Sequence, residues 1–318
     1  MFRSIIVCIA GSAAFSAAVA CGSVARQGQP VKFGDQTNII VYDKDSKVEH
    51  FYRVANFKSP AEDFGFIAPT PTLPKVGEAD KGAIPLLNSL SPNKPPAPAQ
   101  RTGGFGGGGV HVYQVVEAAG YEVTTLKASD TRAMTDWLKQ NNYVMSPGIA
   151  KWAKYYIQKG WYFSAFKFIS KSNETATKMV ELRFKTDNPY NPYYVPTENR
   201  SEPNKLKIYF LGDTSYSARL QGTMIKQKWT AQISSKVGTG LEKLLNLKED
   251  TLSLGSHVTY YELPFPSQAQ EDIFFYERLN GGTESAFKFN PITSLGLGVI
   301  IFGCLATIRR AKLEAGRK

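Results

Sequence analysis

The sequence has little of the residue chemistry on which common enzyme and metal sites depend. Among 318 residues there are three histidines and three cysteines, and the motifs HExxH, CxxC and GxSxG do not occur. The histidines, His50, His111 and His257, stand far apart, and none has a second ligand at the spacing that metal sites use. The sequence therefore predicts no catalytic, cofactor-binding or metal-binding residue.

Two carboxylates near one predicted helix have simpler explanations than catalysis. Asp130 stands where the helix begins and can cap its free backbone N–H groups, while Asp136 lies on the polar side of the same helix. A pair of carboxylates brought together from distant segments is still compatible with the sequence.

One long charge-free stretch lies near the C-terminus. Ile292 to Ile308 reads ITSLGLGVIIFGCLATI and is followed by Arg309 and Arg310. As a helix rising ~1.5 Å per residue it spans roughly 26 Å, near the thickness of a bilayer's hydrocarbon core, where a helix satisfies its own backbone. We predict a transmembrane helix at 291–308 and, from the arginines, a cytoplasmic basic tail at 309–318. A buried core helix is the alternative.

The N-terminus has the pattern of a secretory signal peptide. Arg3 supplies a positive charge, an apolar stretch follows, and Ala18-Val19-Ala20 forms a small-residue cleavage site before Cys21. A lipoprotein is the alternative, but Ala18 is not the leucine that such a signal carries, so we favour ordinary cleavage. We predict a signal peptide at 1–20 and an extracytoplasmic domain at 21–290, in a single-pass protein of the cell membrane.

This topology leaves the extracytoplasmic domain without an internal disulfide. Cys8 lies in the signal peptide and Cys304 in the membrane segment, so only Cys21 remains outside. The domain must be stabilised by burial, for which 19 Phe, 16 Tyr and 4 Trp provide apolar surface.

The net charge of +11 does not indicate nucleic-acid binding. Part of it belongs to the basic tail at 309–318, and the other lysines are spread along the chain, as on a solvated surface. We expect no nucleic-acid partner. Beside the membrane, other envelope proteins and anionic envelope polymer stay open as partners.

Hydrophobic periodicity predicts an α+β fold: a mostly antiparallel sheet with two consecutive helices packed on it. The helices begin at Ser129 or Asp130 and at Ser146, and place Trp137 and Trp152 on apolar faces as core anchors. A short helix is expected at 241–247. Apolar runs predict strands at 38–42, 48–54, 64–68, 110–116, 121–126, 161–169, 180–185, 206–210, 229–233, 257–263 and 273–276.

Two stretches are predicted to be connections. The segment 91–109 is Pro-rich and then Gly-rich, which is typical of a flexible loop within the domain. Its glycines precede a strand and do not open a helix, so a phosphate-binding loop is disfavoured. The segment 188–203 carries three prolines and three tyrosines before Asn199, and we expect it to lie on the surface.

Short blocks occur in a characteristic order along residues 20–215. They are Ala20-Cys21-Gly22, Pro30-Val31, Asn38-Ile39-Ile40, Asp63-Phe64-Gly65-Phe66, Pro69-Thr70-Pro71, Gly120-Tyr121-Glu122-Val123, Asp136-Trp137-Leu138, Asn142-Tyr143 and Gly160-Trp161-Tyr162-Phe163 through Lys167. Together they resemble a bacterial family of exported proteins catalogued only as a domain of unknown function. Ser23 departs from the second glycine that often follows the Cys-Gly pair. The resemblance implies export and C-terminal membrane anchoring, and brings no activity, cofactor or site.

These observations favour a non-catalytic binding or structural module at the cell envelope. The alternatives are an extracytoplasmic hydrolase with an unrecognised site and an adhesion-like module that binds anionic envelope polymer. Carboxylates converging in a cleft would favour the hydrolase, and a flat aromatic and basic surface would favour the binding module. The most informative observation is whether the segment Asp63–Lys75 borders a pocket.

Overall fold

A computed structural model describes residues 22–25, 32–58, 64–92, 114–169, 174–176, 178–197, 204–252, 255–265 and 268–278. All of them belong to a compact unit that ends at Arg278. The predicted signal peptide at 1–20, most of the loop at 91–109, the membrane segment at 291–308 and the tail at 309–318 lie outside the described residues. No described helix is long and apolar enough to cross a membrane.

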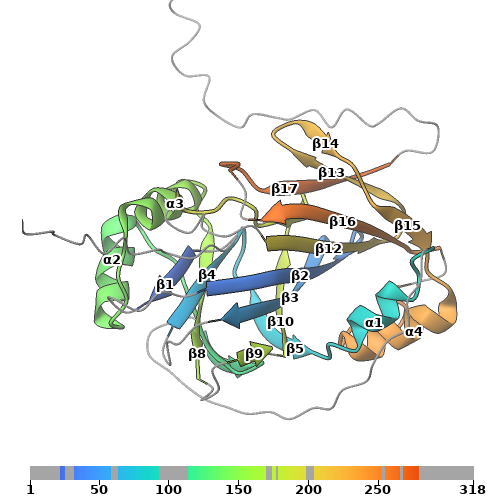
Figure 1. Ribbon diagram of the computed structural model, residues 1–318, viewed down its shortest axis with the longest axis horizontal. Coiled ribbons are helices and arrows are strands. Elements are labelled where there is room, and N and C mark those ends of the chain that lie inside the picture. Colours follow the sequence, from blue (N-terminus) through green and yellow to red (C-terminus); the bar gives the residue numbers. More distant parts are fainter. Residues whose placement is uncertain are drawn as a thin grey trace, which may run out of the picture. The chain divides into compact units, whose positions relative to one another are not determined.

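The largest sheet has eight strands (Figure 1). In spatial order they are β15 (Trp229–Gln232), β16 (His257–Phe265), β12 (Asn204–Gly212), β2 (Lys32–Asp43), β3 (Val48–Lys58), β10 (Met179–Lys185) and β5 (Lys75–Ala79), with β9 (Glu174–Ala176) paired to β3. Every pairing is antiparallel except that of β12 with β2. The expected mostly antiparallel, α+β architecture is confirmed.

A five-stranded sheet carries the two consecutive helices. Its order is β1 (Gly22–Ala25), β4 (Phe64–Thr70), β8 (Tyr162–Phe168), β7 (Tyr121–Leu126) and β6 (Gln114–Ala118). Helices α2 (Thr131–Gln140) and α3 (Pro147–Gln158) pack on it, because their apolar faces share a core cluster with Ile67 and Phe163 of the sheet. The predicted helix pair on a sheet is therefore confirmed.

Local signals explain why these helices begin where they do. Asp130 Oδ1 accepts a hydrogen bond from the Ala133 N–H at 2.8 Å, and Ser146 Oγ accepts one from the Ile149 N–H at 3.2 Å. Each satisfies a backbone donor that the first turn leaves free. Gly160, just beyond α3, has a φ of +72°, which glycine adopts without strain.

Two further helices cover the eight-stranded sheet. Helix α1 (Ala83–Asn88) was not predicted, since it is short and contains Pro85. Helix α4 (Ser235–Leu244) begins earlier than the expected segment 241–247, because Gly238 and Gly240 weaken its apolar pattern. Both helices contribute to the core cluster on one face of that sheet.

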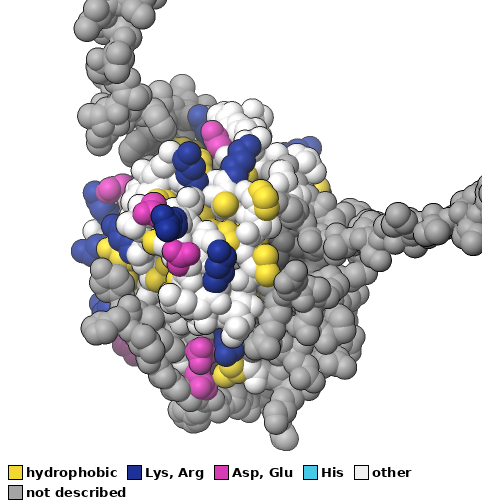
Figure 2. Space-filling model, turned by 90° about the vertical axis from the view of Figure 1, so that its left-hand side faces the viewer, with side chains coloured by type: hydrophobic (Ala, Val, Ile, Leu, Met, Phe, Trp, Pro, Cys, Tyr) yellow, Lys and Arg dark blue, Asp and Glu magenta, His cyan; other side chains and the backbone are white. Residues whose placement is uncertain are grey.

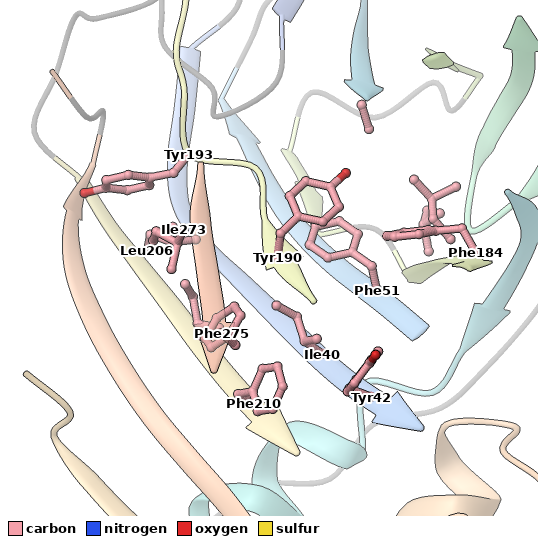
Figure 3. Packing of buried hydrophobic residues seen from close by; sticks show 14 of the residues in the cluster. Ile40, Tyr42, Phe51, Phe184, Tyr190, Tyr193, Leu206, Phe210, Ile273 and Phe275 are labelled. Atoms are coloured by element: carbon pink, nitrogen blue, oxygen red, sulfur yellow. The ribbon is translucent and has the colours of Figure 1, made fainter. Parts of the chain in front are cut away.

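A third, four-stranded sheet consists of β11 (Tyr190–Asn191), β17 (Ile273–Glu277), β13 (Tyr216–Leu220) and β14 (Thr223–Ile225). Its aromatic residues join the cluster on the other face of the large sheet, where Phe275 stacks on Phe210 at a centroid distance of 4.3 Å (Figure 3). The large sheet is thus covered on both faces by apolar side chains.

The segment preceding β12 corrects one prediction. Residues 189–196, expected on the surface, are all buried. Tyr190 and Tyr193 belong to the core cluster of Figure 3, and Tyr194 belongs to the cluster beneath α2 and α3. Buried irregular backbone needs hydrogen-bond partners, and distant side chains provide them: Trp152 Nε1 donates to the Tyr194 carbonyl at 3.1 Å. This segment therefore connects two cores.

The surface on the side of α2 and α3 carries Lys and Arg side chains interspersed with Asp and Glu (Figure 2). On these helices the exposed charged residues are Arg132, Asp136, Lys139, Lys151 and Lys154. Charged side chains spread over exposed helix positions in this way form a solvated face, as the spread of lysines along the sequence predicts.

Candidate functional site

A cavity of about 440 Å³ lies where several chain segments end against one another. We call it the Trp161 pocket. Its aromatic lining residues are Trp161, Tyr190 and Phe274, and the other lining residues are Ser46, Lys47, Pro71, Thr72, Lys185, Thr186, Asp187 and Asn188. Pro71 and Thr72 belong to the segment Asp63–Lys75, so this segment does border a pocket.

Hydrogen bonds between segments hold the polar wall of the pocket in place. The Thr186 N–H donates to the Lys47 carbonyl at 2.9 Å, and the Thr72 hydroxyl donates to the Lys185 carbonyl at 2.7 Å. The Tyr42 hydroxyl donates to the Thr186 carbonyl at 3.2 Å. Burial, reinforced by the nearby Asp187 carboxylate, raises the pKa of Tyr42 to about 12, so that this hydroxyl keeps its proton.

The aromatic wall is held in place by the burial and hydrogen bonding of Tyr190. Tyr190 is fully buried, and its hydroxyl donates to the Pro69 carbonyl. Its ring centroid lies 5.0 Å from that of Trp161 and 6.1 Å from that of Phe274. Trp161 and Phe274 are only half-buried. The wall therefore combines one fully buried ring with two half-buried rings that keep exposed surface.

The charges of the rim are unequal. Lys47 Nζ lies 2.6 Å from Asp187 Oδ1, and both side chains are largely exposed, so this ion pair contributes little to stability. Among the described residues no ion pair includes Lys185. The pocket lining thus includes one lysine that pairs with no acidic side chain in the described part of the chain, together with hydroxyl, amide and carboxylate groups.

A buried carboxyl group supports the aromatic wall. Glu49 is fully buried, and its Oε2 accepts a hydrogen bond from the Tyr190 N–H at 2.9 Å. Its Oε1 has no hydrogen-bond partner within the described part of the chain. Burial raises the pKa of Glu49 well above its usual range. The hydrogen bond from the Tyr190 N–H lowers this pKa, but it offsets only part of the rise. The neutral acid is therefore the form that fits the fold.

This raised pKa predicts a pH-dependent stability. The unfolded chain releases the Glu49 proton above about pH 4.3, whereas the folded chain retains it to higher pH. Folding free energy from this group is thus fully present below pH 4.3 and is lost as pH rises toward the folded pKa. Relative to Glu49→Gln, which cannot ionise, the wild type should lose up to about 1.4 kcal/mol per pH unit in that window.

Urea unfolding of the purified protein at pH 4.5, 6.0 and 7.5 measures this difference. Glu249→Gln, which alters an exposed carboxylate, is the matched control and should follow the wild type. A stability difference between wild type and Glu49→Gln that stays constant with pH would show that Glu49 is ionised in the folded protein.

The residues considered as catalytic candidates do not come together. His50 Nδ1 lies 2.8 Å from Glu181 Oε1 in a buried pair, whereas His257 lies three strands away on the opposite face of the sheet, by the strand register. His111 lies outside the described residues. Asp130 caps α2, and Asp136 is exposed near Arg132. Within the described ranges no group of three His, Cys, Asp or Glu residues could hold a metal ion.

Of the two tryptophans expected as core anchors, one is found in the core. Trp152 is completely buried, whereas Trp137 is half-buried at the edge of the same cluster. Sequence reasoning missed the Trp161 pocket, because Trp161 belongs to a run that reads as a covered strand and no motif links it to Lys185 or Asn188. The alternating prolines at 69, 71 and 74 were the one local signal of an unusual chain path.

Comparison with known families places residues 15–275 in DUF2330, described as an uncharacterized protein conserved in bacteria. The chain belongs to this family. The resemblance of the short sequence blocks to an uncharacterised bacterial family is confirmed, and the match extends it beyond residue 215. No curated protein and no solved structure matches the chain. The DUF2330 match includes every residue that lines the Trp161 pocket.

Proposed function

We propose that this DUF2330 protein is a non-catalytic binding module held on the outer side of a bacterial cytoplasmic membrane, and that the Trp161 pocket is its recognition site. The signal-peptide pattern at 1–20 and the charge-free stretch at 292–308 support the location. The pocket carries the proposal of binding, because its aromatic wall and convergent polar groups are what small-ligand sites usually contain.

The chemistry of the lining supports binding over hydrolysis. Asp187 is the one carboxylate among the lining residues that the structure describes, and it lies against Lys47. A glycosidase-type acid–base pair needs two carboxyl groups facing each other across the substrate. The described lining residues also include no histidine that could act as a base. Converging carboxylates were expected for a hydrolase, and an aromatic and basic surface for a binding module. The pocket has the aromatic and basic side chains of the binding module, although they line a cavity and not a flat surface.

The proposed location gives a topological prediction. A reporter that is active only outside the cytoplasm should work when inserted after Arg278 and should be inactive when fused after Lys318, because the arginines at 309 and 310 favour the cytoplasmic side. Activity of the same reporter after Lys318 would contradict a single C-terminal span with a cytoplasmic tail.

The proposed binding role predicts retention on envelope material. Purified full-length protein in detergent should sediment with isolated bacterial envelope fractions, and Trp161→Ala should sediment much less. Trp229→Ala removes a half-buried tryptophan of β15 that does not line the pocket, so it should be retained like the wild type. Equal retention of wild type and Trp161→Ala on every fraction would overturn the pocket as recognition site.

A further inference from the structure

We infer that the Trp161 pocket recognises an anionic sugar: one ring of a glycan that packs on the aromatic wall and carries a carboxylate or phosphate group bound by Lys185. The inference rests on the proposed function, since it names the class of ligand for the same pocket. Three features of the pocket carry it: its aromatic wall, its polar rim and its charge.

The aromatic wall suits the flat apolar side of a sugar ring. A pyranose ring exposes a patch of C–H groups, whose slightly positive hydrogens pack favourably on the electron-rich face of an aromatic ring. Trp161 and Phe274 are only half-buried, and each lies against the buried Tyr190 ring. The cavity of about 440 Å³ lies toward the small end of ligand sites, which fits a short saccharide better than an extended chain.

The polar rim suits the hydroxyl groups of a sugar. Each sugar hydroxyl both donates and accepts, so that its binding site needs acceptors and donors together. Asp187 provides acceptor oxygens, and the Asn188 amide provides both kinds of group at an exposed position in the rim. An apolar ligand would leave these groups without partners and lose their hydration, which costs free energy.

The charge of the rim indicates a single anionic group on the ligand. Lys47 already has Asp187 as its partner at 2.6 Å. Lys185 takes part in no ion pair with another described residue, and its backbone is held by Thr72 at 2.7 Å. The Lys185 ammonium is carried by a long, exposed side chain at this fixed strand end, and it can form a charge-assisted hydrogen bond with a carboxylate or phosphate.

Saccharide binding to the full-length protein in detergent tests the inference, with intrinsic tryptophan fluorescence and calorimetry as readouts. The probes are oligosaccharides that contain glucuronate, oligosaccharides that carry a phosphate, and the neutral glucose oligosaccharides of equal length. We expect at least one anionic probe to bind roughly three- to tenfold more tightly than its neutral counterpart. Which of the two anionic probes binds distinguishes a uronic acid from a sugar phosphate.

Variants separate the parts of the inference. Lys185→Ala should abolish the preference for the anionic probe, Lys185→Arg should retain it, and Lys226→Ala, at an exposed lysine outside the pocket, should behave as wild type. Trp161→Ala should weaken binding of anionic and neutral probes alike. Because Trp161 also contacts Tyr190, Asn188→Ala provides a second test at an exposed residue, and it too should weaken binding of both probes.

The other possible results contradict either the anionic group, the sugar or the proposed function. If Lys185→Ala keeps the preference, or if the wild type binds both kinds of sugar equally, the assignment of an anionic group is wrong. If no sugar binds while envelope fractions still retain the protein in a Trp161-dependent manner, the sugar is wrong and the proposed function stands; a proline-rich peptide is then the next probe. If retention does not depend on Trp161 either, the proposed function fails as well.

Discussion

Replacing Trp152 with alanine is expected to lower the free energy of unfolding by about 3–5 kcal/mol. The indole is completely buried between α3 and the five-stranded sheet, where its ring centroid lies 5.1 Å from Tyr156 and 6.1 Å from Phe163. Truncation removes this apolar surface, leaves a cavity and deletes the hydrogen bond from Nε1 to the Tyr194 carbonyl. Urea unfolding of the purified protein measures the loss.

Two variants show whether burial is the cause. Trp137→Ala alters a half-buried tryptophan of the same cluster and should cost less than half as much. Trp152→Phe keeps most of the apolar volume and loses the indole N–H, so it should fall between alanine and wild type. A Trp152→Ala protein that unfolds at the same urea concentration as wild type would contradict the packing of α3.

Replacing Asp272 with alanine should destabilise the protein by about 3–5 kcal/mol. Asp272 is buried immediately before β17, and its Oδ1 accepts three hydrogen bonds: from the Tyr156 hydroxyl at 2.8 Å, the Tyr193 N–H at 2.9 Å and the Tyr194 N–H at 3.2 Å. Removing the carboxyl leaves these donors without that acceptor in a region from which water is excluded, and each such loss costs about 1–3 kcal/mol.

Asp272→Asn separates hydrogen bonding from charge. The amide oxygen can accept the same three bonds, and burial already raises the pKa of Asp272, with the hydrogen bonds opposing that rise only in part. We therefore expect Asn to restore more than half of the stability lost with Ala. Thermal melts of the three proteins at one pH provide the comparison, and an Asn variant as unstable as the Ala variant would mean that a full negative charge is required at this position.

The elements that could be predicted from the sequence are those whose causes are local. The two consecutive helices have their caps at Asp130 and Ser146 within three residues of the N–H groups they bind. Apolar residues recur at successive positions along the central strands because apolar clusters cover both faces of the large sheet. Such signals lie within a few positions and can be read without knowledge of the rest of the chain.

The elements that could not be predicted depend on partners far away in the chain. Residues 189–196 are rich in proline, as surface connections are, but they are buried, and Asp272 and Glu49 accept their N–H groups across sequence separations of 78 to 141 residues. The Trp161 pocket also depends on residues that are far apart in the chain. Its lining comes from a turn, a proline segment, the start of a strand and two strand ends, none of which looks unusual alone.

The parallel pairing of β2 with β12 constrains when this protein can fold. Lys205 donates its N–H to Asp35 Oδ1 across 170 residues, beside the register that aligns Leu206 with Gln36. A ribosome adding about 5–20 residues per second needs roughly 10–30 s to make the intervening chain. During that interval β2 and β3 can form a hairpin whose β2 edge stays unpaired, and an unpaired strand edge is prone to association. Strand β2 can pair with β12 only after β12, which ends at Gly212, has been synthesised, so the β2 edge of the hairpin stays unpaired until then.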